Sequence, residues 1–281
     1  VAFANFSKTG KWIDDVESDD LFCRVFLEIS GFRSIDAEDI FRKYRRIINN
    51  YKMTQNLTYH YAFSSLWSTS PELMRMISAK ELHTMLHFGL LEEERDFFLH
   101  GKGPLKQFLL SLDEFDYSWK VPGVQPIKYF LQNSFNTKHN IFAHACEIKQ
   151  EDVKFMQKYD TKINICACPR SDLNFGLKKT PVQMLQNNGV NVCLGTEGKF
   201  MVEDLDIRKD IRLLVNEYGV SSENAIKIAT LNGAYAIGFH REVGSLSPQK
   251  TGRCFIMEFD EQYTDPYDVV ALSDNSIELL L

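Results

Sequence analysis

Residues 140–198 hold the stretch that decides the fold: NIFAHACEI at 140–148, KINICACPRSDLNFG at 162–176 and PVQMLQNNGVNVCLGTEG at 181–198. Apolar runs at 141–146, 163–168 and 190–194 lack strict polar alternation, which is typical of strands buried on both faces. Helix patterns separate them at 150–158 and 181–187, the second opened by Thr180 as N-cap before Pro181. This order predicts a parallel sheet covered by helices.

Two polar residues stand where such a sheet places its chemistry. Functional groups of parallel α/β folds gather at the carboxyl ends of the strands. His144 lies near the end of the first apolar run, and Glu197 follows the third. We therefore expect both residues to lie at the functional edge of the sheet.

Four motifs carry a resemblance to a known family. AHACEI (143–148), CPRSDLNFG (168–176), GVNVCLGTEG (189–198) and IATLNGAYAIGF (228–239) resemble runs of the metal-dependent amidohydrolase superfamily, in its chlorohydrolase and nucleoside or aminofutalosine deaminase branch. The resemblance implies a (β/α)8 TIM barrel with one or two divalent metals and a small β-sandwich. We expect an α/β barrel over residues 1–240, apparently without its first strand, and a C-terminal sandwich remnant over 241–281.

Composition limits the classes of protein that fit. The 281 residues are 44% hydrophobic and 25% charged, enough for one barrel-sized domain. No apolar run approaches the ~20 residues that span a bilayer, and the net charge of −6 argues against a nucleic-acid groove. The six Cys fall in predicted strands, so we expect buried, reduced thiols. These features predict a cytoplasmic protein without membrane or nucleic-acid partners.

The resemblance also implies a metal site. Its family supplies His-x-His from the first strand, further His from the fifth and sixth, and Asp from the eighth. This chain has no His-x-His, but His87, His144 and Glu197 stand at matching positions, Glu197 in place of Asp. They are the expected ligands of Zn²⁺ or Fe²⁺, whether the metal is retained or lost. His144 and Glu197 are also the expected catalytic residues, which orient water and accept its proton.

A second family position is altered. The family pattern is His, two residues, then a Glu that shuttles protons, and here Leu90 occupies the Glu position after His87. A general acid–base contributes ~10²–10⁴-fold, which Leu cannot supply. Glu92 is a weak substitute, because Glu92–Glu94 fit acidic residues at a helix start better. His60 lies in a motif that the family places at a strand end and is the expected substrate contact. Arg170 is expected to bind an anionic group or to form a salt bridge within the protein.

Two functions stay open. The resemblance implies hydrolysis of a C–N or C–halide bond of a heteroaromatic ring, impaired in this chain by the losses above. The alternative is a catalytically inactive barrel that binds a small molecule or a partner protein. A longer precursor or a second chain that supplies the missing strand is a third possibility. The expected ligand is a small molecule, and homodimers are common among relatives.

Overall fold

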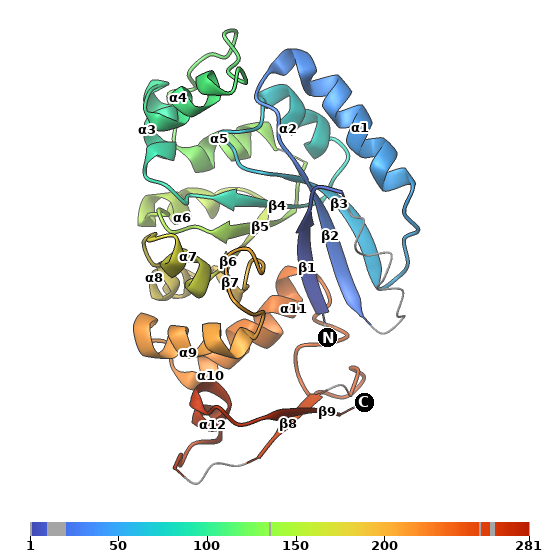
Figure 1. Cartoon of the computed structure of the whole chain (residues 1–281), viewed down its shortest axis with the longest axis vertical. Helices are drawn as coiled ribbons and strands as arrows, with labels where there is room; N and C mark the ends of the chain where they lie inside the picture. Colours follow the sequence, from blue (N-terminus) through green and yellow to red (C-terminus); the bar gives the residue numbers. More distant parts are fainter. Residues whose placement is uncertain (1, 10–20, 135, 253, 259–261, 281) are drawn as a thin grey trace. The chain divides into compact units, whose positions relative to one another are not determined.

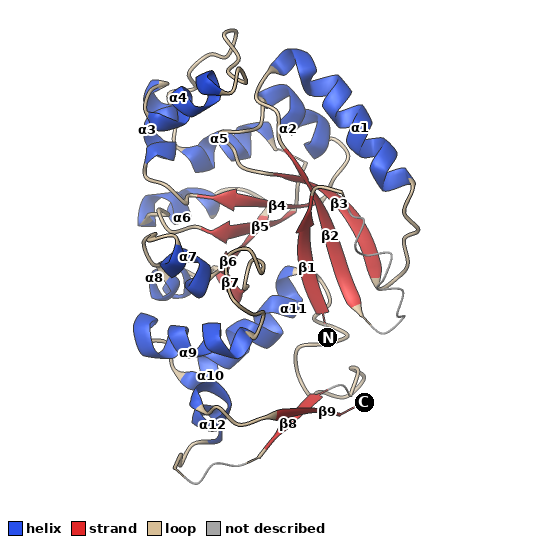
Figure 2. Ribbon diagram, in the orientation of Figure 1, coloured by secondary structure: helices blue, strands red, loops and turns tan. Residues whose placement is uncertain are grey.

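The computed structural model of the chain describes residues 2–9, 21–134, 136–252, 254–258 and 262–280. Strands alternate with helices along most of this length (Figures 1 and 2). The strand pairs that carry the candidate residues are parallel, so the predicted α/β class is confirmed. The chain divides into two compact units, one of residues 4–163 and one of residues 1–3 with 164–281.

The first unit is built on β1 (Ala2–Ser7), of which the first two residues belong to the second unit, and on β2 (Phe22–Ile29), β3 (Leu57–Phe63), β4 (His83–Phe88) and β5 (His139–His144). β2 pairs with β3 in parallel, and β4 pairs with β5 in parallel with Phe88 opposite His144. Between these pairs the N–H of His87 donates to the carbonyl of Ser64 at 3.1 Å, in a parallel bridge. The carboxyl ends of β3, β4 and β5 therefore meet at one edge, where the sequence predicted the functional residues.

The helices of this unit are α1 (Ala37–Asn49), α2 (Pro71–Ser78), α3 (Glu93–His100), α4 (Pro104–Ser111), α5 (Pro126–Asn133) and α6 (Gln150–Met156). Their ends follow local signals in the sequence. The Ser70 hydroxyl accepts the N–H of Leu73 at 3.2 Å, and Pro71 fills the first helical position. Gly101 caps the C-terminus of α3 with a φ of +63°, a backbone conformation that favours glycine. A Cβ at this position would also lie 2.2 Å from Val121.

Phenylalanine dominates the core of the first unit. Phe130 of α5 packs edge-on against Phe142 of β5 at 5.0 Å and against Phe63 of β3 at 6.1 Å between ring centroids. All three rings are fully buried, and edge-to-face packing is a favourable arrangement for aromatic pairs. The strands that end at Phe63 and His144 are thus held on one packed aromatic layer.

The second unit contains the parallel pair β6 (Lys162–Ala167) and β7 (Asn191–Leu194), of which only the first two residues of β6 belong to the first unit. Its helices are α7 (Pro169–Asn174), α8 (Val182–Asn187), α9 (Ile207–Tyr218), α10 (Ser222–Lys227), α11 (Gly233–Ala236) and α12 (Pro266–Leu272). A π-helical turn, Ile228–Asn232, joins α10 to α11. β8 (Cys254–Met257) and β9 (Ile277–Leu280) form an antiparallel pair.

Several predicted boundaries were wrong. β5 ends at His144 rather than at residue 146, because His144 and Ala145 both have positive φ, which breaks the extended strand. α8 begins at Val182 without a Thr180 cap, since the Thr180 hydroxyl donates instead to Asp172 at 3.4 Å.

All six cysteines are free, as predicted. Five are buried and Cys254 is half-buried. Cys146 and Cys168 follow β5 and β6 instead of lying within them, which corrects the prediction that every Cys is in a strand. Among the described residues, no helix combines the length and apolar character needed to cross a membrane.

Candidate metal centre

Two histidines face each other at the carboxyl ends of β4 and β5. The ring centroids of His87 and His144 are 5.3 Å apart, with 30° between the ring planes. His144 is fully buried, and Phe6 of β1 stacks on the His87 ring at 4.9 Å. β4 and β5 are parallel neighbours, and their register brings together these two residues, which are 57 residues apart in sequence. The predicted proximity of His87 and His144 is confirmed.

The backbone at His144 is in a conformation that L-residues rarely adopt. His144 has φ +70° and Ala145 has φ +55°. The N–H of Ala145 donates to the carbonyl of Phe88 at 2.9 Å, and the N–H of Glu147 donates to that of Gly89 at 2.8 Å. Non-glycine residues in this region cost about 1–3 kcal/mol and concentrate at functional sites. The turn is therefore maintained against strain, which supports a functional role for His144.

Glu197 belongs to the second unit and shares this backbone feature. It follows β7 by three residues, its φ is +62°, and its side chain is exposed. Its carboxylate oxygen Oε2 accepts a hydrogen bond from the hydroxyl of Ser171, at the start of α7. His87 and His144 of the first unit each offer a ring nitrogen to a metal ion, and Glu197 of the second unit offers a carboxylate oxygen; that the three bind one ion stays a prediction. Two imidazoles and a carboxylate are a donor set that suits zinc and iron(II).

The loop after β4 carries Leu90 and is organised by a residue that the sequence did not single out. Glu94 is 2% exposed, and its carboxylate accepts the N–H groups of Gly89 at 3.1 Å and Leu90 at 3.0 Å. Burial raises the pKa of Glu94 to about 7, with these bonds opposing the shift. Glu92 is exposed at the start of α3, which confirms that the acidic run opens a helix. In the sequence, Glu94 could have been found from its position four residues after Leu90, because from there its side chain can reach the backbone of the preceding turn.

His60 does not lie at the carboxyl end of β3, which corrects the expected placement. It is three residues before the end of the strand, and its ring contacts Glu81 at 3.0 Å and Arg24 at 3.1 Å. The strand ends at Phe63, and the hydroxyl of Ser64 donates to Glu28 at 2.6 Å. Glu28 is thus paired within the sheet.

His60 instead begins a row of three histidines across the sheet. Its ring centroid is 5.3 Å from that of His83, which stacks on His139 at 4.7 Å with 14° between the planes. His83 and His139 are the first residues of β4 and β5. Burial, followed by the nearby Arg24 charge, lowers the pKa of His83 to about 3. The His83 imidazole is consequently neutral near pH 7. The row of three histidines lies towards the amino ends of these strands.

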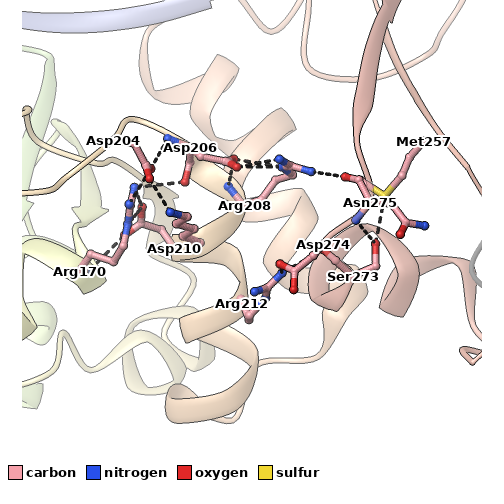
Figure 3. A network of polar contacts seen from close by, with 11 residues as sticks. Arg170, Asp204, Asp206, Arg208, Asp210, Arg212, Met257, Ser273, Asp274 and Asn275 are labelled. Carbon is pink, nitrogen blue, oxygen red and sulfur yellow. Dashed lines mark hydrogen bonds and ion pairs between the residues drawn. The ribbon is translucent and has the colours of Figure 1, made fainter.

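Arg170 is engaged in an internal ion-pair network of the second unit (Figure 3). Its guanidinium contacts Asp210, which is fully buried, at 2.8 Å, and Asp204 at 3.0 Å. A further N–H donates to the carbonyl of Asp206 at 3.1 Å. Of the two expected roles, the structure shows the salt bridge, and Arg170 fastens α7 to α9 and to the loop before it.

A model of the amidohydrolase family matches residues 21–277. The chain belongs to the amidohydrolase family. This amidohydrolase chain is 27% identical over 201 residues to a 5-methylthioadenosine/S-adenosylhomocysteine deaminase of Thermoanaerobacter pseudethanolicus, covering 67% of the chain and 41% of the relative. A protein of the same name from Acetivibrio thermocellus is 23% identical over 271 residues, covering 92% and 58%. The amidohydrolase chain thus spans about half the length of these relatives.

Solved structures share the fold. Aminofutalosine deaminase of Helicobacter pylori aligns with a TM-score of 0.78 at 18% identity, covering 98% of this chain and 71% of the other. Atrazine chlorohydrolase TrzN of Arthrobacter aurescens, complexed with zinc, aligns with a TM-score of 0.72 at 16% identity, covering 98% and 65%. These likenesses confirm the amidohydrolase-type α/β fold that the motifs predicted.

Proposed function

We propose that this amidohydrolase is a metal-dependent hydrolase that acts on a C–N or C–halide bond of a heteroaromatic ring. The relatives named above are deaminases and a chlorohydrolase, and two of the similar structures, including an adenosine deaminase of Xanthomonas campestris, hold zinc. The observation that carries the proposal is the facing pair His87 and His144 at adjacent strand ends, 5.3 Å apart. A purine-like ring bearing an amino group is the proposed substrate class.

His87, His144 and Glu197 are the proposed metal ligands, with zinc as the metal and Fe²⁺ as the alternative. Three protein ligands of this type leave a coordination position for water or substrate, the arrangement of hydrolytic metal sites. A divalent cation bound there supplies Lewis-acid activation for attack on a ring carbon. The strained turn at His144 fixes the imidazole, and the Glu197 carboxylate is the proposed acceptor of the proton from water.

Slow turnover is part of the proposal, because Leu90 has no group that can carry a proton to the leaving nitrogen. Its neighbour Glu94 is committed to the backbone of the same loop, and Glu92 is exposed at the helix start. Leu90→Glu is therefore expected to raise the rate of ammonia release, by up to about 10²-fold if the carboxylate reaches the leaving group. Leu91→Glu, one residue away, is the matched control and should leave the rate unchanged.

Metal content and ammonia release test the proposal together. The purified chain is loaded with Zn²⁺, dialysed, and analysed for bound metal and for deamination of adenosine and 5-methylthioadenosine. Wild type should keep about one equivalent of metal, and His87→Ala, His144→Ala and Glu197→Ala should each lose most of it. His100→Ala, at an exposed histidine of α3, is the control. A wild-type chain that retains less than roughly a tenth of an equivalent would sink the proposal.

A further inference from the structure

A fully buried hydroxyl holds the proposed carboxylate ligand in the second unit. Ser171 is 0% exposed and donates from Oγ to Oε2 of Glu197. Ser171 lies in α7, directly after β6, and Glu197 follows the parallel neighbour β7. The two strand ends are tied by the N–H of Gly195, which donates to the carbonyl of Ala167 at 2.9 Å. The hydrogen bond between Ser171 and Glu197 therefore joins the segment after β6 to the segment after β7.

Ser171 has a rigid support. The adjacent Arg170 is fixed through its backbone N–H and its guanidinium to the buried carboxylate of Asp210, at 3.1 and 2.9 Å. Its other N–H groups hold Asp204 and the carbonyl of Asp206, in the segment that continues from Glu197 towards α9 (Figure 3). The first turn of α7 is thus fastened to the segment that follows Glu197, which keeps the Ser171 hydroxyl in place.

Glu197 needs such a partner. Its side chain is exposed and its backbone has φ +62°. A carboxylate offers about four lone-pair sites, so the bond from Ser171 to Oε2 orients the group and leaves acceptor sites for a metal. Residues that orient metal ligands by hydrogen bonds typically affect metal affinity or activity 10–100-fold.

We propose that Ser171 is a positioning residue that orients the carboxylate of Glu197 for binding of a divalent metal. The inference rests on the proposed function, because it takes Glu197 as a ligand. It assigns to Ser171 no contact with substrate. Arg170, for which the sequence left open an anionic ligand or an internal salt bridge, then acts as the support of Ser171.

The experiment measures Zn²⁺ affinity by competition with a chelator, together with the visible spectrum of the Co²⁺-loaded protein. Ser171→Ala should weaken Zn²⁺ binding about 10–100-fold and change the Co²⁺ spectrum, and Ser171→Thr, which keeps the hydroxyl, should recover most of the affinity. Ser222→Ala is the matched control: Ser222 is a buried serine of the same unit that donates to the carboxylate of Asp268. It should leave metal affinity unchanged.

A double-mutant cycle separates positioning from general stability. In a Glu197→Ala background, Ser171→Ala should cause no further loss of metal affinity, because its effect passes through the carboxylate. If Ser171→Ala does not fold, Ser171→Cys, with a similar shape and a weak donor, should show a loss in the same direction. If wild type and the Ser171 variants bind Zn²⁺ with equal affinity, the inference about Ser171 is overturned and the proposed function is not. A wild type that binds no metal overturns the proposed function as well.

Discussion

The carboxylate of Glu94 accepts the backbone N–H of Leu90 at 3.0 Å, from inside the fold. A second oxygen accepts the N–H of Gly89 at 3.1 Å, two residues after His87. The loop that leaves β4 is therefore held by a buried side chain of the helix that follows it. This contact gives Glu94 a structural role. The sequence did not indicate that role, because Glu94 lies in a run of acidic residues.

Removal of this carboxylate should destabilise the first unit. Glu94→Ala leaves three backbone donors, those of Gly89, Leu90 and Leu91, without their acceptor, and we expect a loss of about 2–4 kcal/mol in the free energy of unfolding. Urea denaturation at neutral pH measures it. Glu93→Ala, in the same helical turn, should change the value by less than about 0.5 kcal/mol. Equal effects of the two variants would contradict the assigned role.

Glu94 should also make stability depend on pH. Burial raises its pKa from 4.5 to about 7, so the folded state binds this proton more tightly than the unfolded state. The free energy of unfolding should therefore decrease as pH rises from 4.5 to about 7 and then level off, with a slope of at most about 1.4 kcal/mol per unit. Urea titrations across this range should show the slope in wild type and its absence in Glu94→Gln.

The opposite dependence is expected from His83, at the centre of the histidine row. Its pKa is lowered from 6.5 to about 3 by burial and then by the Arg24, His60 and His139 charges. As pH falls from 6.5 towards 3, the unfolded chain gains a proton that the folded chain does not, so the free energy of unfolding should decrease. His83→Phe should retain more stability at pH 5 relative to pH 7.5 than wild type does. The exposed variant His100→Gln should follow wild type.

The Arg170 pair should behave as a buried ion pair. Arg170→Ala leaves the carboxylate of Asp210 buried without its cation, and we expect a loss of about 3–5 kcal/mol in unfolding free energy. The double variant Arg170→Met/Asp210→Leu should lose less, because no buried charge remains. Lys209→Ala removes an exposed partner of Asp204 and should cost less than about 1 kcal/mol. A similar effect of Arg170→Ala and Lys209→Ala would refute the buried-pair interpretation.

The thiols should be unreactive in the native protein. Five of the six are buried, and burial raises the pKa of Cys23 to about 12. Since the thiolate is the reactive form, an aromatic disulfide reagent at neutral pH should modify at most Cys254 rapidly and all six in urea. Rapid native labelling of Cys23 or Cys168 would show that these strand regions open readily.

Local pattern and strand direction were sufficient to predict much of this protein. Apolar runs without alternation identify buried parallel strands, and such strands end at a common edge, which is where His144 was expected; the resemblance to the family implied that His87 lies beside it, and the two rings are 5.3 Å apart. The motifs around 143–148 and 168–176 identified the family that residues 21–277 match. These signals are contained within a few residues of one another along the chain.

Only the tertiary structure decided which side chains those residues meet. Arg170 is bound by Asp210 and Ser171 by Glu197, partners 40 and 26 residues away that local periodicity does not specify. His60 lies three residues short of its strand end, because strand register, not the motif around it, sets its position. The positive φ angles of His144 and Glu197 likewise depend on turns held by neighbouring strands and helices, since few residues other than glycine adopt that backbone.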